Sequence, residues 1–274
     1  MNTGSESHLA QRAVAVLATP DPQAKAALAR EVAAAWRRGE ISEVGSAAVP
    51  ARPSRPGRPL LKRPGEVLKR KINRGIAGRG ALLHALAHIE LNAIDLAVDI
   101  VARFTAEALP RAFYDDWLKV AEEEGKHFLL LARRLEDLGL AYGDLPAHDG
   151  LWQAAEETAQ DLLARLAVVP LVLEARGLDV TPAMVAKLHA VEDHESAAVL
   201  QVIYDDEIGH VAIGKRWFDH LCAGRGLEAQ PTWQRLVRQY FRGQLKPPFN
   251  DAARCEAGFP ADFYATLAPV QVAE

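Results

Sequence analysis

The sequence is poor in cysteine and in long apolar runs, and each shortage excludes a class of protein. Cys222 and Cys255 are the two cysteines, too few for a disulfide framework or a cysteine-rich zinc site. Free thiols are what a reducing compartment favours. No window reaches the roughly 18 uninterrupted apolar residues of a membrane span. Residues 1–20 show no basic segment before an apolar core, so we expect no signal peptide. These shortages together predict a cytoplasmic protein without a membrane partner.

The whole chain carries no large excess of charge of either sign, but one segment is strongly basic. The formal net charge is −4, which by itself predicts neither a nucleic-acid nor a membrane partner. Residues 50–79, however, carry ten Lys or Arg against the single acid Glu66, with five prolines among them. Such a basic, proline-rich strap could bind RNA or an acidic surface. We favour the alternative that it is an extended segment wrapped along the rest of the molecule.

Strand-like alternation is nearly absent, and the apolar residues recur with the helical period of 3.6. The first helix should begin at Pro22, after the capping residue Asp21, and end before Gly39. Long helices then follow, separated by Pro110, by "GLAYGDLPAHDG" and by "GLDVTP". The expected helices span residues 22–38, 81–108, 111–138, 150–177 and 183–223, with shorter ones at 231–243 and 250–257. The segment 183–223 could be one kinked helix or be divided.

Four long amphipathic helices predict an all-α fold built on a four-helix bundle. We expect residues 1–79 to supply an N-terminal helix and the extended Pro/Arg-rich strap. The bundle should occupy residues 80–224, and short C-terminal helices should fill residues 225–274. All three parts are expected to form one structural unit.

The stretch "YDDEIGHV", residues 204–211, places an acid on the apolar side of a helix. Glu207 shares its face with Leu200, Ile203 and Val211, and His210 projects beside it. A buried carboxylate without a partner is costly, so it needs a proton, a counter-charge or a metal. One Glu-x-x-His spacing alone is weak evidence for any of these.

The other long helices repeat the feature in a regular order. Each carries one glutamate on its apolar stripe, and the second helix adds a histidine three residues later. The set in chain order is Glu90, then Glu124 with His127, then Glu174, then Glu207 with His210. The pattern of Glu, Glu-x-x-His, Glu, Glu-x-x-His is the ligand set of ferritin-like carboxylate bundles that hold two iron or manganese ions.

These residue types suit a pair of divalent cations. Carboxylates can bridge two metals and offset their mutual repulsion, and one imidazole per metal leaves coordination positions open. Hard oxygen donors with some nitrogen favour iron or manganese, and no thiolate is present to favour zinc. We therefore predict two metal ions as the cofactor, with iron preferred and manganese as the alternative.

Two further pairs of residues that contain histidine are not assigned to this centre. His88 lies about 200° around its helix from Glu90. We therefore expect it and His84 to contact the strap or to hydrogen-bond around the site. His189 and Glu192 lie four to five turns from Glu207, and we interpret them as a polar helix end or a cap.

Two other residues could serve the predicted centre. Tyr204, one turn before Glu207, is a candidate catalytic electron relay, although simple core filling would explain it equally well. Pro170 must disturb the third helix one turn before Glu174. That disturbance either opens the helix to substrate or oxygen or is a plain kink.

The chain resembles a known family in several motifs. "HALAHIELNAIDLAVD", "EEEGKHF", "EARGLDVTP", "DDEIGHVAIG", "PARPSRPGRP" and "LKPPFN" are similar to the ferritin-like family catalogued as domain-of-unknown-function family 455, from about residue 10 onward. The resemblance implies a ferritin-like fold and a metal site at the six residues above, but no substrate. More distant ferritin-like relatives include a tRNA hydroxylase, rubrerythrins, manganese catalases and ribonucleotide reductase small subunits. The rubredoxin-like cysteines of rubrerythrin are absent here.

The leading functional hypothesis is an oxidoreductase that activates dioxygen or peroxide at a di-iron centre and oxidises an organic substrate. Its substrate would be a small molecule, or a tRNA held by the strap. An external electron donor is implied, because no flavin or nicotinamide motif is visible. The alternatives are ferroxidase activity or iron handling, manganese catalase, and a metal-stabilised scaffold without catalysis. A homodimer is one assembly that the chain could form.

Overall fold

A computed structural model describes residues 8–63, 66–67 and 71–269 of the chain. Within these ranges the regular structure is helical, and the only bridge of the β type joins Leu61 to Ala147 in isolation. The all-α prediction is therefore confirmed. By their internal contacts the residues form two units, 1–152 and 153–274. Helix α5, Gly150–Glu157, contains this boundary.

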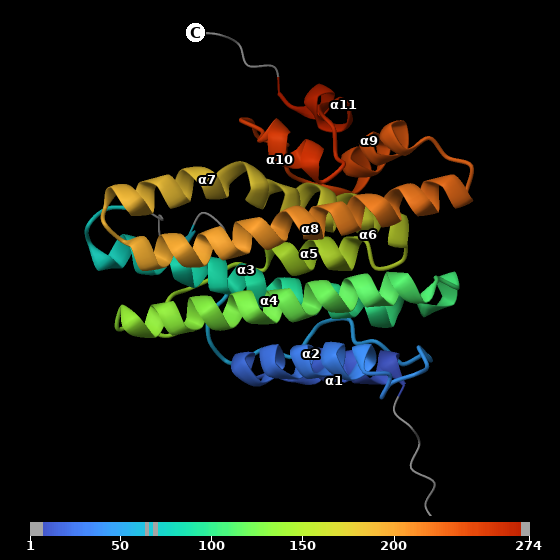
Figure 1. Cartoon of the computed structure of the whole chain (residues 1–274), viewed down its shortest axis with the longest axis horizontal. Helices are drawn as coiled ribbons and strands as arrows, with labels where there is room; N and C mark the ends of the chain where they lie inside the picture. Colours follow the sequence, from blue (N-terminus) through green and yellow to red (C-terminus); the bar gives the residue numbers. More distant parts are fainter. Residues whose placement is uncertain (1–7, 64–65, 68–70, 270–274) are drawn as a thin grey trace, which may run out of the picture. The chain divides into compact units, whose positions relative to one another are not determined.

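The first unit is a helical hairpin with a shorter pair of helices packed on it. Its helices are α1 (Leu9–Ala18), α2 (Pro22–Arg37), α3 (Ile76–Arg103), the 3₁₀ turn η2 (Thr105–Glu107) and α4 (Arg111–Asp137). Helices α3 and α4 lie side by side, with α1 against α3 and α2 against α4 (Figure 1). The predicted helices at 22–38 and 111–138 are confirmed to within one residue.

The capping residues explain where these helices begin and why one of them was not predicted. Asp21 caps α2 as expected, since its carboxylate accepts the N–H of Ala24 at 2.8 Å. Helix α3 begins five residues earlier than expected, after Gly75, whose position has no side-chain cap. Helix α1 was not predicted. It is only 10 residues long and is capped by the His8 ring, which is not one of the usual capping side chains.

Residues 50–63 of the strap lie extended along the first unit. Ser54 donates its N–H to the Leu17 carbonyl, and Lys62 donates its N–H to the Ala147 carbonyl, each at 2.8 Å. The side chain of Arg103 donates to the carbonyl of Pro50 at 2.9 Å. These contacts join this part of the strap to α1, to α3 and to the loop that follows α4. Residues 64–65 and 68–70 lie outside the described residues, and residues 76–79 already belong to α3.

A buried charge cluster joins the strap and α2 to α3. The fully buried Asp95 lies 2.5 Å from Lys25 Nζ and 2.9 Å from an Arg55 guanidinium nitrogen. Lys25 also donates to the carbonyl of Ser54, and Arg55 donates to Asn92 at 2.7 Å. Burial raises the pKa of Asp95, while the charges of Arg55 and Lys25 oppose that rise. The cluster fixes α3 by contacts with two segments that are distant in sequence.

His84 and His88 fasten the loop that follows α4. The neutral His88 ring donates from Nε2 to the carbonyl of His148 at 3.1 Å and accepts the Tyr142 hydroxyl at Nδ1, at 2.8 Å. His84 accepts the N–H of Gly143 at 2.9 Å. Their hydrogen-bond partners therefore lie in the loop at residues 138–149, rather than in the strap.

The second unit is a hairpin of α7 (Ala175–Ala190) and α8 (His194–Gly224), preceded by α6 (Leu162–Val168) and a π-helical turn, η3 (Val169–Glu174). Short helices follow: α9 (Ala229–Tyr240), α10 (Asp251–Glu256), α11 (Ala261–Tyr264) and the 3₁₀ turn η4 (Ala265–Leu267). Helix α9 packs on α6 and α8, and α10 packs on α7 and α8 (Figure 1). The two predicted C-terminal helices are confirmed apart from their ends.

The helix predicted at 150–177 is wrong in extent, and the segment predicted at 183–223 is divided, which is one of the two forms expected for it. The first is divided into α5, α6 and η3, and "GLDVTP" lies inside α7 instead of ending a helix. Pro182 cannot donate to the Leu178 carbonyl four residues earlier, and the side-chain amide of Asn250 donates to it instead, at 3.1 Å. The true break is at residues 191–193, where Glu192 adopts a φ of 66° and Asp193 caps α8.

No helix among the described residues has the length and apolar character needed to cross a bilayer.

Replacing Asp95 by Ala should destabilise the protein strongly, because Lys25 and Arg55 would keep buried or part-buried charges without their partner. We expect a loss of about 3–5 kcal/mol in the free energy of unfolding, measured by urea denaturation. Glu40→Ala is the control, since it breaks an exposed pair with Arg38 and should leave stability near wild type. Equal stability of the two variants would contradict the role given to the cluster.

The buried His88 should make stability depend on pH. Burial and the nearby Arg55 charge lower the pKa of His88 from 6.5 to about 3. Below pH 6.5 the unfolded chain therefore binds a proton at His88 that the native state does not bind. The free energy of unfolding thus falls as the pH falls. Relative to His88→Gln, wild type should lose about 2 kcal/mol of unfolding free energy between pH 7 and pH 5. Parallel pH profiles for the two proteins would refute this.

Candidate metal centre

The first unit gathers three of the predicted ligands. Glu90 comes from α3, and Glu124 and His127 come from successive turns of α4. His127 Nδ1 lies 3.4 Å from a carboxylate oxygen of Glu90 and 3.4 Å from one of Glu124. One potential ligand atom from each residue lies within 4.8 Å of the others, and all three side chains are buried. The structure thus brings together the three residues that the apolar stripes singled out.

The electrostatics of this cluster favour a bound cation. Burial raises the pKa of Glu90 well above its usual value, and the negative charge of Glu124 raises it further, while the contact with His127 lowers it. Two crowded, dehydrated carboxyl groups do not both ionise readily. A cation between the two carboxylates would offset both the cost of burying their charges and the repulsion between them. These three side chains could therefore hold a metal.

The second unit carries the matching residues on its own hairpin. Glu207 and His210 lie on successive turns of α8, with His210 Nδ1 3.5 Å from a carboxylate oxygen of Glu207. Both are buried. Glu174 is the last residue of η3 and is half-buried. Glu90, Glu124 and His127 are called the first half-site below, and Glu174, Glu207 and His210 the second half-site.

Pro170 and Gly214 together shape the backbone before Glu174. Pro170 has no N–H to donate, and the chain around it widens into the π-helical turn η3, in which the N–H of Ala175 bonds the carbonyl of Pro170. Gly214, seven residues after Glu207, lies directly against the proline, since a Cβ there would be 2.3 Å from Pro170 Cβ. The predicted disturbance of the helix is confirmed. Such π turns are frequent at functional sites.

Comparison with known proteins places the chain in a family. Residues 18–265 match the model of the family described as "Protein of unknown function (DUF455)". The chain belongs to this family. It is also 45% identical over 206 residues to an uncharacterized protein of Haemophilus influenzae, covering 73% of this chain and 71% of that protein. No solved structure matches the chain.

Side chains of the C-terminal segment of this DUF455 chain hydrogen-bond the region after Glu174. The sequence did not predict these contacts. Arg254 donates to both carboxylate oxygens of Asp179, at 2.8 and 2.7 Å. The Asn250 amide donates to the carbonyl of Leu178 and, at 3.0 Å, to the hydroxyl of Tyr204. Asn250 therefore ties α7 to α8 one turn before Glu207. The only signal for these contacts was the "LKPPFN" motif, and the electron-relay role of Tyr204 stays a prediction.

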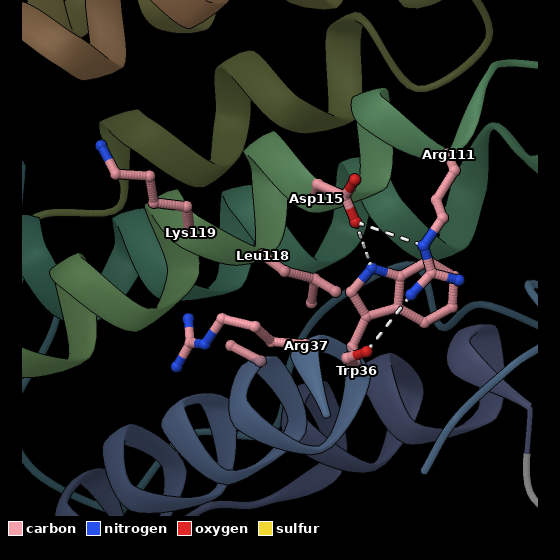
Figure 2. A pocket seen from close by; sticks show the side chains of 7 residues that line it. Trp36, Arg37, Arg111, Asp115, Leu118 and Lys119 are labelled. Carbon is pink, nitrogen blue, oxygen red and sulfur yellow. Dashed lines mark hydrogen bonds and ion pairs between the residues drawn. The ribbon is translucent and has the colours of Figure 1, made fainter. Parts of the chain in front are cut away.

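A cavity of about 300 Å³ lies in the first unit, between α2 and α4. The Trp36 indole donates to Asp115 at 2.6 Å, and the Arg111 guanidinium stacks 3.9 Å above the Trp36 ring (Figure 2). Arg37 on its wall is bound by Glu122 through two hydrogen bonds. None of the six predicted ligands lines this cavity, so it does not give access to the half-sites.

Replacing Gly214 by Ala should force Pro170 away from α8 and disturb the turn that ends at Glu174. We expect a loss of about 1–3 kcal/mol in unfolding free energy from this overpacking, measured by chemical denaturation.

Gly177→Ala in α7 is the matched control, because nothing lies within 4 Å of a Cβ at that position. It should be neutral or stabilise by about 0.5–1 kcal/mol, since Gly is a poor residue in helix interiors. If Gly214→Ala were equally benign, the close contact with Pro170 would not constrain this turn.

Proposed function

We propose that the chain is a ferritin-like carboxylate protein whose two half-sites jointly hold a dinuclear metal centre. In this proposal, α3–α4 and α7–α8 are the two hairpins of a four-helix bundle. Helices α3 and α4 supply Glu90, Glu124 and His127, and the turn η3 with α8 supplies Glu174, Glu207 and His210. The observation that carries it is the clustering of Glu90, Glu124 and His127 within the first unit. The second hairpin repeats the same residue types on its own buried face, as the Glu207–His210 pair illustrates.

The residues fit a pair of iron or manganese ions. The donors are carboxylate oxygens with one imidazole in each half-site, a set that suits these metals better than soft ones. Cys222 and Cys255 belong to neither half-site, so no thiolate enters the donor set. Bound cations would offset the crowding that raises the pKa of Glu90. Iron is our preferred metal, and manganese is the alternative.

The reaction we propose is oxidation of an organic substrate with dioxygen or peroxide. The metal pair would supply open coordination positions and redox electrons. The four glutamates would hold the metals through their carboxylates, His127 and His210 would each supply one nitrogen donor, and the burial of the site would limit access of water. Electrons would come from an external donor. Ferroxidase activity, iron handling and manganese catalase use the same donor set and remain the alternative functions.

The strap bears on the choice between a small substrate and tRNA. Arg52 pairs with Asp149, and Arg55 pairs with Asp95. Two of the three arginines of "PARPSRPGRP" are therefore engaged inside the first unit and contribute less to phosphate binding. This supports a small-molecule substrate over a tRNA held by the strap.

Metal binding should stabilise the protein in a way that depends on both half-sites. Adding Fe(II) under anaerobic conditions, or Mn(II), should raise the unfolding free energy of wild type by about 2.7 kcal/mol at a hundredfold excess over the dissociation constant. Glu124→Ala and Glu207→Ala should each lose most of this gain. Melting curves with and without metal measure it.

The control is Glu136→Ala, which removes an acid from the same helix at a surface position where it pairs with Arg133. Its metal response should equal that of wild type. Loss of the response in Glu124→Ala but not in Glu207→Ala would mean that the first half-site acts alone. That result would overturn the two-half-site proposal.

A further inference from the structure

Two histidines meet at the turn between α7 and α8, away from the residues of the half-sites in sequence. His189 is the penultimate residue of α7, and His194 is the first residue of α8. Their Nδ1 atoms lie 2.9 Å apart and their ring centroids 5.2 Å apart. Both residues are exposed. The sequence suggested a polar helix end or cap formed with Glu192, but the cap is Asp193 and the partner of His189 is His194.

The turn that pairs them is held by its own backbone. Glu192 takes a left-handed φ of 66°, a conformation that is uncommon outside glycine and that clusters at functional positions. The N–H groups of Glu192 and Asp193 bond carbonyls in the last turn of α7, each at 3.0 Å. The Asp193 carboxylate accepts the N–H of Ser196 at 3.1 Å. The backbone of this turn therefore places His194 beside His189, and the two rings also contact each other.

The spacing of the two nitrogens matches the bite of a metal chelate. Imidazole nitrogens bind zinc at about 2.0–2.1 Å, and two such bonds at a right angle place the nitrogens about 2.9 Å apart. We infer that His189 and His194 form a second metal site, which binds a late first-row divalent cation such as Ni²⁺, Cu²⁺ or Zn²⁺. Imidazole nitrogen suits these cations, and water would fill the other coordination positions.

The proton balance of this binding is simple. In the metal-free pair, one ring donates its Nδ1–H and the other accepts it. The cation replaces that proton and binds both Nδ1 atoms. The displaced proton returns through solvent to Nε2 of the same ring, so both rings stay neutral and no net proton is released.

The site would act as a clip between α7 and α8. It joins the end of one helix to the start of the next, and α8 also carries Glu207. A cation that binds the folded turn and not the unfolded chain stabilises this hairpin by mass action. The inference is independent of the proposed function, because neither histidine belongs to a half-site.

Nickel titration of the full chain tests the site. Ni²⁺ is the probe because the exposed thiol of Cys255 could reduce Cu²⁺. Isothermal titration calorimetry should show wild type binding Ni²⁺ at this site at least about tenfold more tightly than His189→Gln or His194→Gln, since the second donor binds as an intramolecular step. The double variant should bind Ni²⁺ at this position no more tightly than either single one.

Two controls make the result specific. His220→Gln removes another exposed histidine of α8 and should bind Ni²⁺ as wild type does. Glu124→Ala should also keep the tight Ni²⁺ site, which separates this inference from the fate of the carboxylate centre. Unchanged Ni²⁺ binding in either His189→Gln or His194→Gln would overturn the inference, as would loss of the site in Glu124→Ala.

Discussion

The constraint on which the rest of the structure depends is the burial of carboxylates on the apolar faces of long helices. Glu90 and Glu124 are dehydrated and close to each other, with His127 touching both. Such an arrangement opposes ionisation of the pair unless a positive charge joins it. A fold that keeps these acids buried must stabilise their helices by other contacts, and a cation bound between the acids would add to that stability.

Those other contacts come from segments that are distant in sequence. In the first unit, Lys25 of α2 and Arg55 of the strap converge on Asp95, a little more than one helical turn after Glu90 on α3. In the second unit, the C-terminal segment reaches α7 through Asn250 and Arg254. In each unit, segments distant in sequence therefore contact the hairpin at residues that are not predicted ligands.

The sequence predicted the residues of the first half-site because each acid interrupts an apolar stripe of period 3.6, a signal that needs no tertiary information. The extent of α7 could not be predicted in that way. Gly177 and Pro182 normally end a helix, and here Asn250, 72 residues after Leu178, satisfies the carbonyl that Pro182 leaves. The burial of Asp95 was equally hidden, since Asp95 is distinguished from a surface acid only by its contacts with Lys25 and Arg55. The pairing of His189 with His194 depends on the φ of Glu192, which no pattern in the sequence specifies.

The most direct test of the central claim is X-ray absorption spectroscopy at the metal edge, on protein loaded with iron and analysed for metal content. The account predicts two iron ions per chain, oxygen and nitrogen ligands without sulfur, and a metal–metal scattering distance of about 3.5–4 Å. One ion per chain, with no second metal in its scattering shell, would contradict the dinuclear centre.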